Sequence, residues 1–398
     1  MSLQGKPLEA ITEADFQGLI ENQVRESQTL EYKRDPYGRG DEQVREMLRD
    51  ISSLANAFGG DLLIGIGENE EGVAVDILGI ENAEQEATRI ISSSVSNLQE
   101  RILGLRAWPA PIEGGRHVIV VRIPRSLRAP HMVTFKGLNQ SWIRHDRQKS
   151  PMSIQEIREA RLRVEGLMPQ VDRFRKERKI EILPQTGSSP CYIVSATPIF
   201  VNTEVLDVGD RKLRHLLEHP PDQRQGGFVV GFDRATSQPT LHGLTIGYEG
   251  WKHVELFRNG HLELWVEGDS LLDRSVKIGD REFSLLRALA LCEYPVSLFR
   301  LGKAIYSYLG LNDPVVISVS MYNIQGLALA KDAGDGIYLE LPGYVTPCRE
   351  KYLEIPPGQV TSLDEPDKVA KRFVDRIWQA FGYERAPFFD DEGTFRLQ

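Results

Sequence analysis

Two glutamates and a lysine lie close together near the start of the chain, in the stretch RESQTLEYKRD (residues 25–35). Glu31 follows Glu26 by five positions, and Lys33 follows Glu31 by two. If TLEYK is a strand, Glu31 and Lys33 lie on one face of a sheet, because side chains alternate along a strand. A third acid, Glu68, comes directly after the apolar run LLIGIG. If the two strands are neighbours, the three carboxylates converge.

The chemistry open to these side chains is metal-assisted phosphate chemistry. Clustered carboxylates at a strand end provide the oxygen ligands that Mg²⁺ and Mn²⁺ prefer, and such a metal stabilises a reacting phosphate and activates water. Glu26, Glu31 and Glu68 are therefore candidate metal ligands and catalytic residues. Lys33 is a candidate catalytic residue that would contact phosphate. The alternative is a solvated sheet face with an ordinary Glu–Lys pair, worth well under ~1 kcal/mol.

Basic side chains gather further along the chain, near an aromatic residue and after a predicted strand. Their residue types suit contacts to phosphate combined with base stacking. The candidates for nucleic-acid binding are Arg122, Arg125, Arg128, Trp142, Arg144, Arg147 and Lys149. A structural network of ion pairs with the acidic first hundred residues is the competing explanation.

The net charge of −9 is unevenly distributed along the chain. Residues 1–100 hold 8 Lys and Arg against 20 Asp and Glu, residues 101–180 hold 18 against 7, and residues 181–398 hold 22 against 30. The three segments therefore carry −12, +11 and −8. A cationic block inside an acidic protein is typical of a localised polyanion-binding face. An arginine-rich, solvated helical surface explains the same charge pattern equally well.

The elements that would position these side chains alternate between strands and helices, which indicates a mixed α and β domain. A helix over 8–24, with Thr12 as N-cap and Asp15 in the capping-box position, precedes the strand TLEYK. An amphipathic helix over 44–58 follows and ends at FGG. The later expected elements are the strand DLLIGIG, a helix over about 82–101, the strands RHVIVVRIP, PHMVTFKG and QSWIRHD, and a helix that opens at Ser150 or Ser153.

The second half of the chain predicts a separate domain, after a linker at residues 184–190. VELFR and HLELW, joined by Asn-Gly, are typical of a β-hairpin. The other expected elements are strands at CYIVSATPIF, GGFVVGFD and PTLHGLTIG, a helix over about 281–309, strands near 315–330 and 337–342, and a last helix over about 365–381. This half carries no recognisable chemical signature.

Several function classes are excluded by what the sequence lacks. The glycines of FGGDLLIGIG come before and inside a strand, so they form neither a P-loop nor a dinucleotide fingerprint, and no nucleotide cofactor is expected. The three cysteines are far apart in the sequence, which fits a reducing compartment. No apolar run reaches the ~20 residues that span a membrane, and the N-terminus lacks a signal-peptide core. A cytoplasmic protein without a membrane partner is expected.

The order of these motifs resembles the AlbA-type domain of the Schlafen family. The matching stretches, within residues 20–165, are ESQTLEYK, LANAFGG, LLIGIGENEEG, VIVVRIPRSLRAPH and WIRHDRQKSPMSIQEI. The resemblance implies an α+β fold class. A Schlafen AlbA-like mixed sheet with helices would occupy residues 1–180 as a nucleic-acid-processing domain. A separate α+β C-terminal domain over residues 190–398 would have a regulatory, sensing or partner-binding role.

The resemblance also implies roles for the acidic residues. In Schlafen nucleases this domain carries an acidic triad that cleaves structured RNA, notably tRNA, with a divalent metal. Glu26 and Glu31 match the two glutamates of that triad, and Lys33 matches the lysine that follows. The third acid, usually an aspartate just after the second strand, is where this sequence departs, because Gly67 holds the nearest position and Glu68 follows it. The zinc-binding Cys/His set of the animal proteins is missing from the sequence. Those proteins have two lobes in one chain, and a homodimer or higher oligomer could supply the second lobe here if the fold needs it.

The resulting expectation is an endoribonuclease that depends on Mg²⁺ or Mn²⁺ and acts on structured RNA such as tRNA, with RNA favoured over DNA as the partner. Resemblance to bacterial relatives of this layout implies a role in stress or phage defence. The alternative is a non-catalytic DNA- or RNA-binding protein, transcriptional or regulatory, in which the irregular third acid marks an inactive site. A third interpretation is a protein-interaction scaffold whose basic block meets its own acidic domains.

Overall fold

The structure is a computed structural model that describes residues 3, 6–224, 226–231, 235–248, 251–278, 280–311, 313–330 and 345–396. The chain divides into two compact units. The first holds Met1–Leu167 with the short segment Gly310–Asn312, and the second holds Met168–Leu309 and Asp313–Gln398. The division falls inside a long helix, α4 (Ile154–Thr186), which continues through the first part of the segment predicted as a linker.

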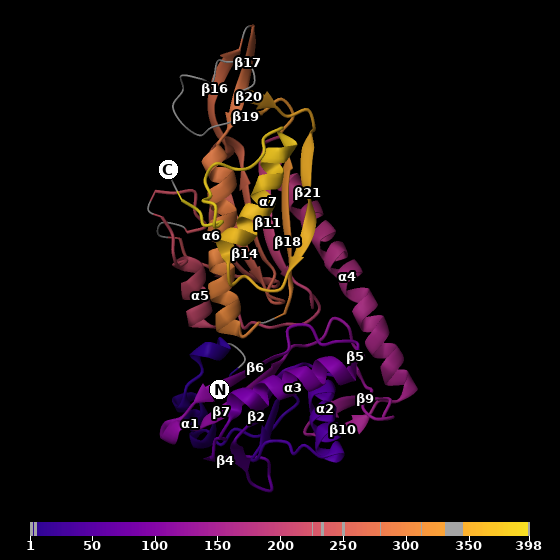
Figure 1. The fold of residues 1–398 in the computed structure, drawn as a ribbon. Helices are drawn as coiled ribbons and strands as arrows, with labels where there is room; N and C mark the ends of the chain where they lie inside the picture. Colours follow the sequence, from indigo (N-terminus) through magenta and orange to yellow (C-terminus); the bar gives the residue numbers. More distant parts are fainter. Residues whose placement is uncertain are drawn as a thin grey trace. The chain divides into compact units, whose positions relative to one another are not determined.

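The first unit contains short helices and strands arranged around a mixed sheet (Figure 1). Its elements are η1 (Leu8–Ala10), α1 (Glu13–Glu21), β1 (Leu30–Lys33), α2 (Asp41–Asn56), β2 (Gly60–Ile64), β3 (Ile66–Glu68), β4 (Ala74–Ile77), α3 (Ala83–Asn97), β5 (Leu98–Gln99), β6 (Arg106–Pro111), η2 (Glu113–Gly115), β7 (His117–Ile123), β8 (Met132–Val133), β9 (Gln140–His145) and β10 (Gln148–Pro151).

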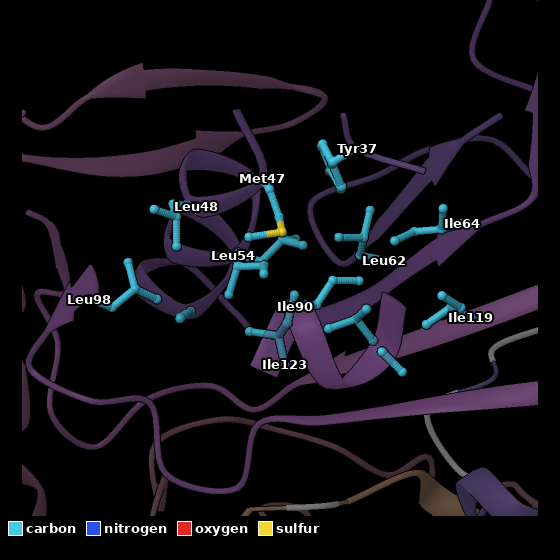
Figure 2. Packing of buried hydrophobic residues seen from close by; sticks show 14 of the residues in the cluster. Tyr37, Met47, Leu48, Leu54, Leu62, Ile64, Ile90, Leu98, Ile119 and Ile123 are labelled. Atoms are coloured by element: carbon cyan, nitrogen blue, oxygen red, sulfur yellow. The ribbon is translucent and has the colours of Figure 1, made fainter. Parts of the chain in front are cut away.

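The central sheet of this unit has the strand order β1-β2-β7-β6. β1 runs parallel to β2, whereas β2, β7 and β6 pair antiparallel. A second small sheet, β10-β9-β8-β5, lies beside α2. Two hydrophobic cores cover the two faces of the central sheet. The core that α2 and α3 form with β2 and β7 is shown in Figure 2, where Met47, Leu54, Leu62, Ile90 and Ile119 meet.

The second core lies on the opposite face of the central sheet. Phe16 and Leu19 of α1 pack there with Tyr32 of β1 and with Leu63 and Val120 of the neighbouring strands. Because Tyr32 enters this core, its neighbours Glu31 and Lys33 point to the other face, where α2 lies. The predicted alternation of β1 is therefore confirmed.

Local sequence signals account for the ends of these elements. The capping box of Thr12 and Asp15 starts α1 as predicted, and Ser153 caps α4 through Glu156.

Glycines with positive φ determine where two other elements end. α2 ends before Gly59 and Gly60, both of which have positive φ. The run predicted as one strand, DLLIGIG, is broken at Gly65, whose φ is +104°, so that β3 leaves the central sheet and pairs with β4.

The second unit is a larger sheet with helices and a small extra sheet. Its elements, besides the C-terminal part of α4, are β11 (Cys191–Pro198), α5 (Arg211–Glu218), β12 (Gln238–Pro239), β13 (Gly243–Tyr248), β14 (Lys252–Phe257), β15 (Leu262–Glu267), η3 (Gly268–Leu271), β16 (Leu272–Ile278), β17 (Arg281–Leu286), α6 (Ala288–Leu309), β18 (Val315–Tyr322), β19 (Ala328–Ala330), β20 (Val345–Pro347), β21 (Tyr352–Val360) and α7 (Pro366–Ala380).

Seven strands of this unit form one sheet in the order β12-β13-β14-β15-β11-β18-β21. α6 packs on α7, and the two helices contact β11, β15 and β21 (Figure 1). The C-terminal part of α4 contributes Ile182 to a separate cluster with Cys191, Ile193 and Trp265. The predicted Asn-Gly hairpin is confirmed as β14 and β15, with Gly260 at φ +82°.

Two expectations for the second half are wrong. Residues 226–231 of the predicted strand GGFVVGFD form no strand, because the amides of Phe228 and Val230 donate to the side chains of Glu293 and Ser297 on α6, at 2.8 and 2.9 Å. The helix expected from residue 281 begins only at Ala288, because Arg281–Leu286 pairs with β16. The strand expected near 337–342 lies outside the described residues.

Candidate active site

The centre of the candidate site is Glu31, in the middle of β1. Its side chain is almost completely buried, with 6% of the residue exposed. One carboxylate oxygen accepts a hydrogen bond from Lys33 Nζ, and the other accepts one from Arg144 Nη1 of β9. The Arg144 side chain is 1% exposed and also donates through Nε to the Ser27 carbonyl, at 2.8 Å. Two cations therefore neutralise Glu31 inside the protein.

Asp50 of α2 lies beneath this pair and was not among the sequence candidates. It is fully buried, it accepts a hydrogen bond from the Tyr37 hydroxyl at 2.6 Å, and it forms an ion pair with Lys149. Lys149 is paired with Asp50 Oδ1, and Lys33 Nζ lies 3.8 Å from Oδ2, the oxygen that accepts from Tyr37. Although burial opposes the charged form, the carboxylates of Asp50 and Glu31 hold the pKa of Lys33 above its ordinary value. Lys33 is therefore a fixed positive charge at the edge of the site.

Glu26 lies in the turn before β1 and faces the other acids. Its Oε1 accepts a hydrogen bond from the Tyr32 amide at 2.9 Å, which turns the carboxylate toward β1. Burial raises the pKa of Glu26 to about 7, and the nearby charge of Glu31 and then that of Glu68 add to the effect. Glu68, at the exposed end of β3, makes no side-chain hydrogen bond or ion pair among the described residues. Glu31 and Glu68 are thus each close enough for their charges to act on Glu26.

Carboxylate oxygens match a hard divalent cation, and the mutual repulsion at Glu26 is what such a cation would relieve. The arrangement is nevertheless no ready-made metal cage: within the described part of the chain, no group of three or more His, Cys, Asp or Glu side chains could hold a metal ion. Both Glu31 oxygens are occupied by Lys33 and Arg144. Glu26 and Glu68 are therefore the acids with oxygens available to a cation, and Glu31 would join them only by leaving a cationic partner.

Two of the predicted nucleic-acid contacts are internal, and their assignment is corrected. Arg144 is the buried partner of Glu31. Arg122 of β7 is held by Asp61, with Nε at 2.9 Å from Oδ1, and also donates to the carbonyls of Lys6 and Leu3. Because these guanidinium groups satisfy buried acids and carbonyls, they are not available to phosphate in this structure. The sequence could not show this, since Arg122 and Asp61 are 61 residues apart.

Two further candidates, Lys149 and Trp142, are partly engaged. Lys149 is paired with Asp50 and Glu46 of α2. Trp142 is half-buried against the core that α2 and α3 form, and the Arg49 guanidinium lies 4.9 Å from the centre of its ring. The Trp142 ring is therefore less open to base stacking than the sequence predicted.

The remaining predicted contacts lie nearer the surface. Arg128 and Arg147 are exposed, and Arg147 donates to the Glu71 carbonyl close to Glu26. Arg125 stands over the half-exposed ring of Phe58, at 5.4 Å from its centre. These three arginines stay candidates for contact with a polyanion.

Arg34 and Arg39 are exposed cations that sequence reasoning missed. Both lie in the loop between β1 and α2, directly after Lys33, and neither forms a hydrogen bond or ion pair with another described residue. The sequence could have indicated them, because the stretch KRDPYGRG follows directly on the strand that carries Glu31 and contains both arginines. Their position beside the acidic site makes them further candidates for phosphate contact.

Asn56 explains why two of the recognised motifs occur together. Its side-chain amide donates to the carbonyls of His131 and Trp142, at 3.0 and 2.8 Å, and its oxygen accepts from the His131 amide at 2.6 Å. Burial lowers the pKa of His131, whose ring contacts the Glu100 carbonyl. The LANAFGG and PH motifs therefore have a structural role in joining α2 to β8 and β9.

Comparison with known proteins gives one family match. Residues 26–153 match the family described as Schlafen, AlbA_2. The matched segment includes the three acids and all of the predicted basic contacts. No curated protein matches the chain.

Two solved structures are similar to part of the chain. The N-terminal domain of a RecG-related protein from Nitrosomonas europaea is 20% identical, with 36% of this chain and 93% of that chain covered and a TM-score of 0.27. The DIP2311 protein from Corynebacterium diphtheriae is 15% identical, with 37% of this chain and 27% of that chain covered and a TM-score of 0.27. In the described part of the chain, no helix could cross a membrane.

Proposed function

We propose that this chain, whose residues 26–153 belong to the Schlafen AlbA_2 family, is an endonuclease that hydrolyses phosphodiester bonds of structured RNA such as tRNA. The family match supports a function that involves nucleic acid. The observation that carries the more specific proposal is the place of Glu26, whose Oε1 accepts a hydrogen bond from the Tyr32 amide of β1 at 2.9 Å. Burial, and then the charges of Glu31 and Glu68, raise the pKa of Glu26 to about 7.

Each side chain has a role in this proposal that follows from its contacts. Lys33, kept charged by Asp50 and Glu31, would bind and neutralise the phosphate at the reacting position. Glu26 and Glu68, with Glu31 if it leaves a partner, would hold Mg²⁺ or Mn²⁺, which supplies Lewis-acid stabilisation of phosphate and an activated water. Arg34, Arg39, Arg128 and Arg147 are exposed and would hold the rest of the polymer.

Two parts of this proposal rest on the family resemblance alone. One is a role in stress or phage defence. The other is a homodimer that completes a second lobe, which light scattering of the purified protein would test.

A cleavage assay on total tRNA, single-stranded DNA and duplex DNA tests the proposal. We expect cleavage of tRNA with Mg²⁺ or Mn²⁺, none with EDTA, and a loss of at least about 100-fold in Glu26→Gln and in Glu68→Gln. Glu70→Gln, an exposed neighbour in the same turn, is the matched control and should retain full activity. Cleavage that persists in Glu26→Gln and Glu68→Gln would contradict the assignment of the site.

A non-catalytic nucleic-acid-binding protein is the second candidate. The observation that favours it is the pairing of Glu31 with both Lys33 and Arg144, which leaves this acid neutralised without a metal. In that case tRNA or DNA would bind without cleavage, binding would weaken steeply with salt, and Glu26→Gln would leave the affinity unchanged.

A further inference from the structure

The second unit contains a cavity that lies far in the sequence from the candidate active site. Its volume is about 290 Å³, and it opens beside α6 between that helix and the segment that follows α5. An adjoining hollow of about 360 Å³ shares Asp222 and Arg300 with it. Both hollows are lined by described residues of the second unit.

The wall of this cavity is fixed in place by a buried carboxylate. Glu293 of α6, 3% exposed, binds the Arg224 guanidinium through two hydrogen bonds of 2.8 and 2.9 Å and also accepts from the Phe228 amide at 2.8 Å. Gly227 lets the chain approach so closely, because a Cβ there would stand 2.4 Å from the Glu293 carboxylate. These hydrogen bonds and the close approach at Gly227 therefore fix the shape of this wall of the cavity.

The charges around the cavity are arranged with acids inside and cations toward the opening. Glu293 is 3% exposed whereas its partner Arg224 is 39% exposed, and Asp367 is 14% exposed whereas its partner Arg300 is 26% exposed. Arg224 Nη1 makes no hydrogen bond among the described residues. Lys303 Nζ uses one of its three protons on the Asp364 carbonyl, at 2.7 Å.

One acid opposes this arrangement. Asp222 is exposed at the opening, where it lines both hollows with a left-handed φ of +54°. Its charge would repel an anion, so its removal offers a test of the sign of the ligand's charge.

The rest of the lining is partly apolar. Val229, Val296 and Phe395 form its apolar part, and Gln223 and Ser297 complete the wall. A volume near the lower end of the range for ligand pockets favours a small molecule. Guanidinium and ammonium groups next to an aromatic ring suit a phosphate joined to an apolar or aromatic group.

We propose that this cavity binds a small phosphorylated molecule with an aromatic group, of which a nucleoside monophosphate is the simplest representative. Lys303 and the Nη1 group of Arg224 would contact the phosphate, and Phe395 with the two valines would contact the ring. Arg300, bound to Asp367 and to the Asp222 carbonyl, would add its positive charge beside them. The site is separate from the acidic site on β1, and it gives the second unit a ligand that could report on nucleotide levels.

Titration calorimetry of the full chain with AMP, inorganic phosphate and adenosine tests this proposal. We expect AMP to bind, inorganic phosphate to bind at least about tenfold more weakly, and adenosine not to bind. No heat with AMP, or equal affinity for AMP and adenosine, would overturn the proposal, because the cationic groups would then have no role. Equal affinity for AMP and inorganic phosphate would overturn the assignment of the apolar wall.

Two variants with opposite expected effects place the binding in this cavity. Lys303→Gln removes an exposed cation and should weaken AMP binding about fivefold. Asp222→Asn removes the opposing charge and should tighten it about threefold, and asparagine tolerates the left-handed backbone at that position. Lys277→Gln, an exposed lysine on β16, is the control and should change nothing. Unchanged AMP affinity in both Lys303→Gln and Asp222→Asn would exclude this cavity as the site.

Discussion

At the residue scale, the candidate site is a network of ion pairs and not an isolated cluster of acids. Glu31 is neutralised by Lys33 and Arg144, and Asp50 is neutralised by Lys149 with help from the Tyr37 hydroxyl. Of the three predicted acids, Glu31 is in ion pairs, whereas Glu26 and Glu68 form none with another described residue. The network therefore holds the Glu31 side chain in place and leaves Glu26 and Glu68 to interact with a ligand.

The buried ion pair gives the first prediction. Arg144→Gln leaves the Glu31 carboxylate buried with one cation instead of two, so we expect a loss of about 3–5 kcal/mol in the free energy of unfolding, measured by urea denaturation. Arg147→Gln, an exposed arginine in the following turn, is the matched control and should cost less than about 0.5 kcal/mol. Similar losses in the two variants would show that Arg144 is not the essential partner of Glu31.

At the element scale, the position of β1 depends on how closely β2 approaches it. Gly60, at the start of β2, has a φ of +147°, and a Cβ there would stand 2.3 Å from the Thr29 carbonyl oxygen. The same sheet edge carries Glu31 on β1, paired with Leu62 of β2. The glycines of FGG thus end α2 and also allow the parallel pairing that places the acidic site.

The second prediction concerns this close approach. Gly60→Ala should lower the free energy of unfolding by more than the about 1–2 kcal/mol that a left-handed backbone costs alone, because the backbone of Thr29 must also move. Gly114→Ala is the matched control, since Gly114 has a φ of +79° but open space around its Cβ position. Thermal or urea denaturation of the two variants would show the difference, and equal losses would contradict the steric argument.

The third prediction concerns α4 and the sheet of the second unit. Burial raises the pKa of Glu255 on β14 to about 7, with the charges of Glu263 and Glu181 adding to the effect and Arg178 of α4 opposing it. The folded state then holds a proton that the unfolded state has lost, so the stabilisation present below about pH 4.5 is lost as the pH rises through 7. The slope should be at most about 1.4 kcal/mol per pH unit, the limit for one proton.

Glu255→Gln removes this titration while keeping a hydrogen-bond acceptor for Arg178. The difference in free energy of unfolding between the variant and the wild type should therefore grow as the pH rises from 5 to 7, in favour of the variant. A difference that stays constant over this range would show that Glu255 titrates normally.

At the scale of the whole molecule, the cationic block of residues 101–180 is not one binding face. Its last part, on α4, is paired with acids of the second unit: Arg178 with Glu255 and Glu263, and Lys179 with Glu354. Within the first unit, Arg122 and Arg144 are also internal. The exposed cations near the acidic site are instead spread over the β1–α2 loop and the β7–β8 and β9–β10 connections.

The fourth prediction follows from this redistribution. Arg34→Gln combined with Arg39→Gln should weaken tRNA binding and reduce the slope of the logarithm of affinity against the logarithm of salt concentration by about two. Arg173→Gln combined with Lys176→Gln removes two exposed cations of α4 and is the matched control, with no expected change in slope. Fluorescence anisotropy of labelled tRNA over a salt series measures both. An equal loss of tRNA affinity and of salt slope in the control would show that the cationic block of residues 101–180 is the binding face after all.

The sequence by itself determined the elements whose signals are local and the order of motifs that matches the Schlafen, AlbA_2 family model over residues 26–153. The capping box of α1, the alternation of β1 and the Asn-Gly hairpin each depend on neighbouring residues, so they could be predicted without the fold. The short spacing between Glu26, Glu31 and Lys33 also keeps these three side chains near one another. The helix expected from residue 281 failed because strand pairing with β16 overrides the local preference.

Only the tertiary structure decided which charged side chains can contact a ligand and which are paired inside the protein. Glu31 and Arg144 are 113 residues apart, Asp50 and Lys149 are 99 apart, and Glu293 and Arg224 are 69 apart. Residue types and spacing identify a charged side chain, but its partner depends on which segments the fold brings together. For that reason the sequence could propose Arg144 as a phosphate contact, whereas the fold makes it the buried counter-ion of Glu31.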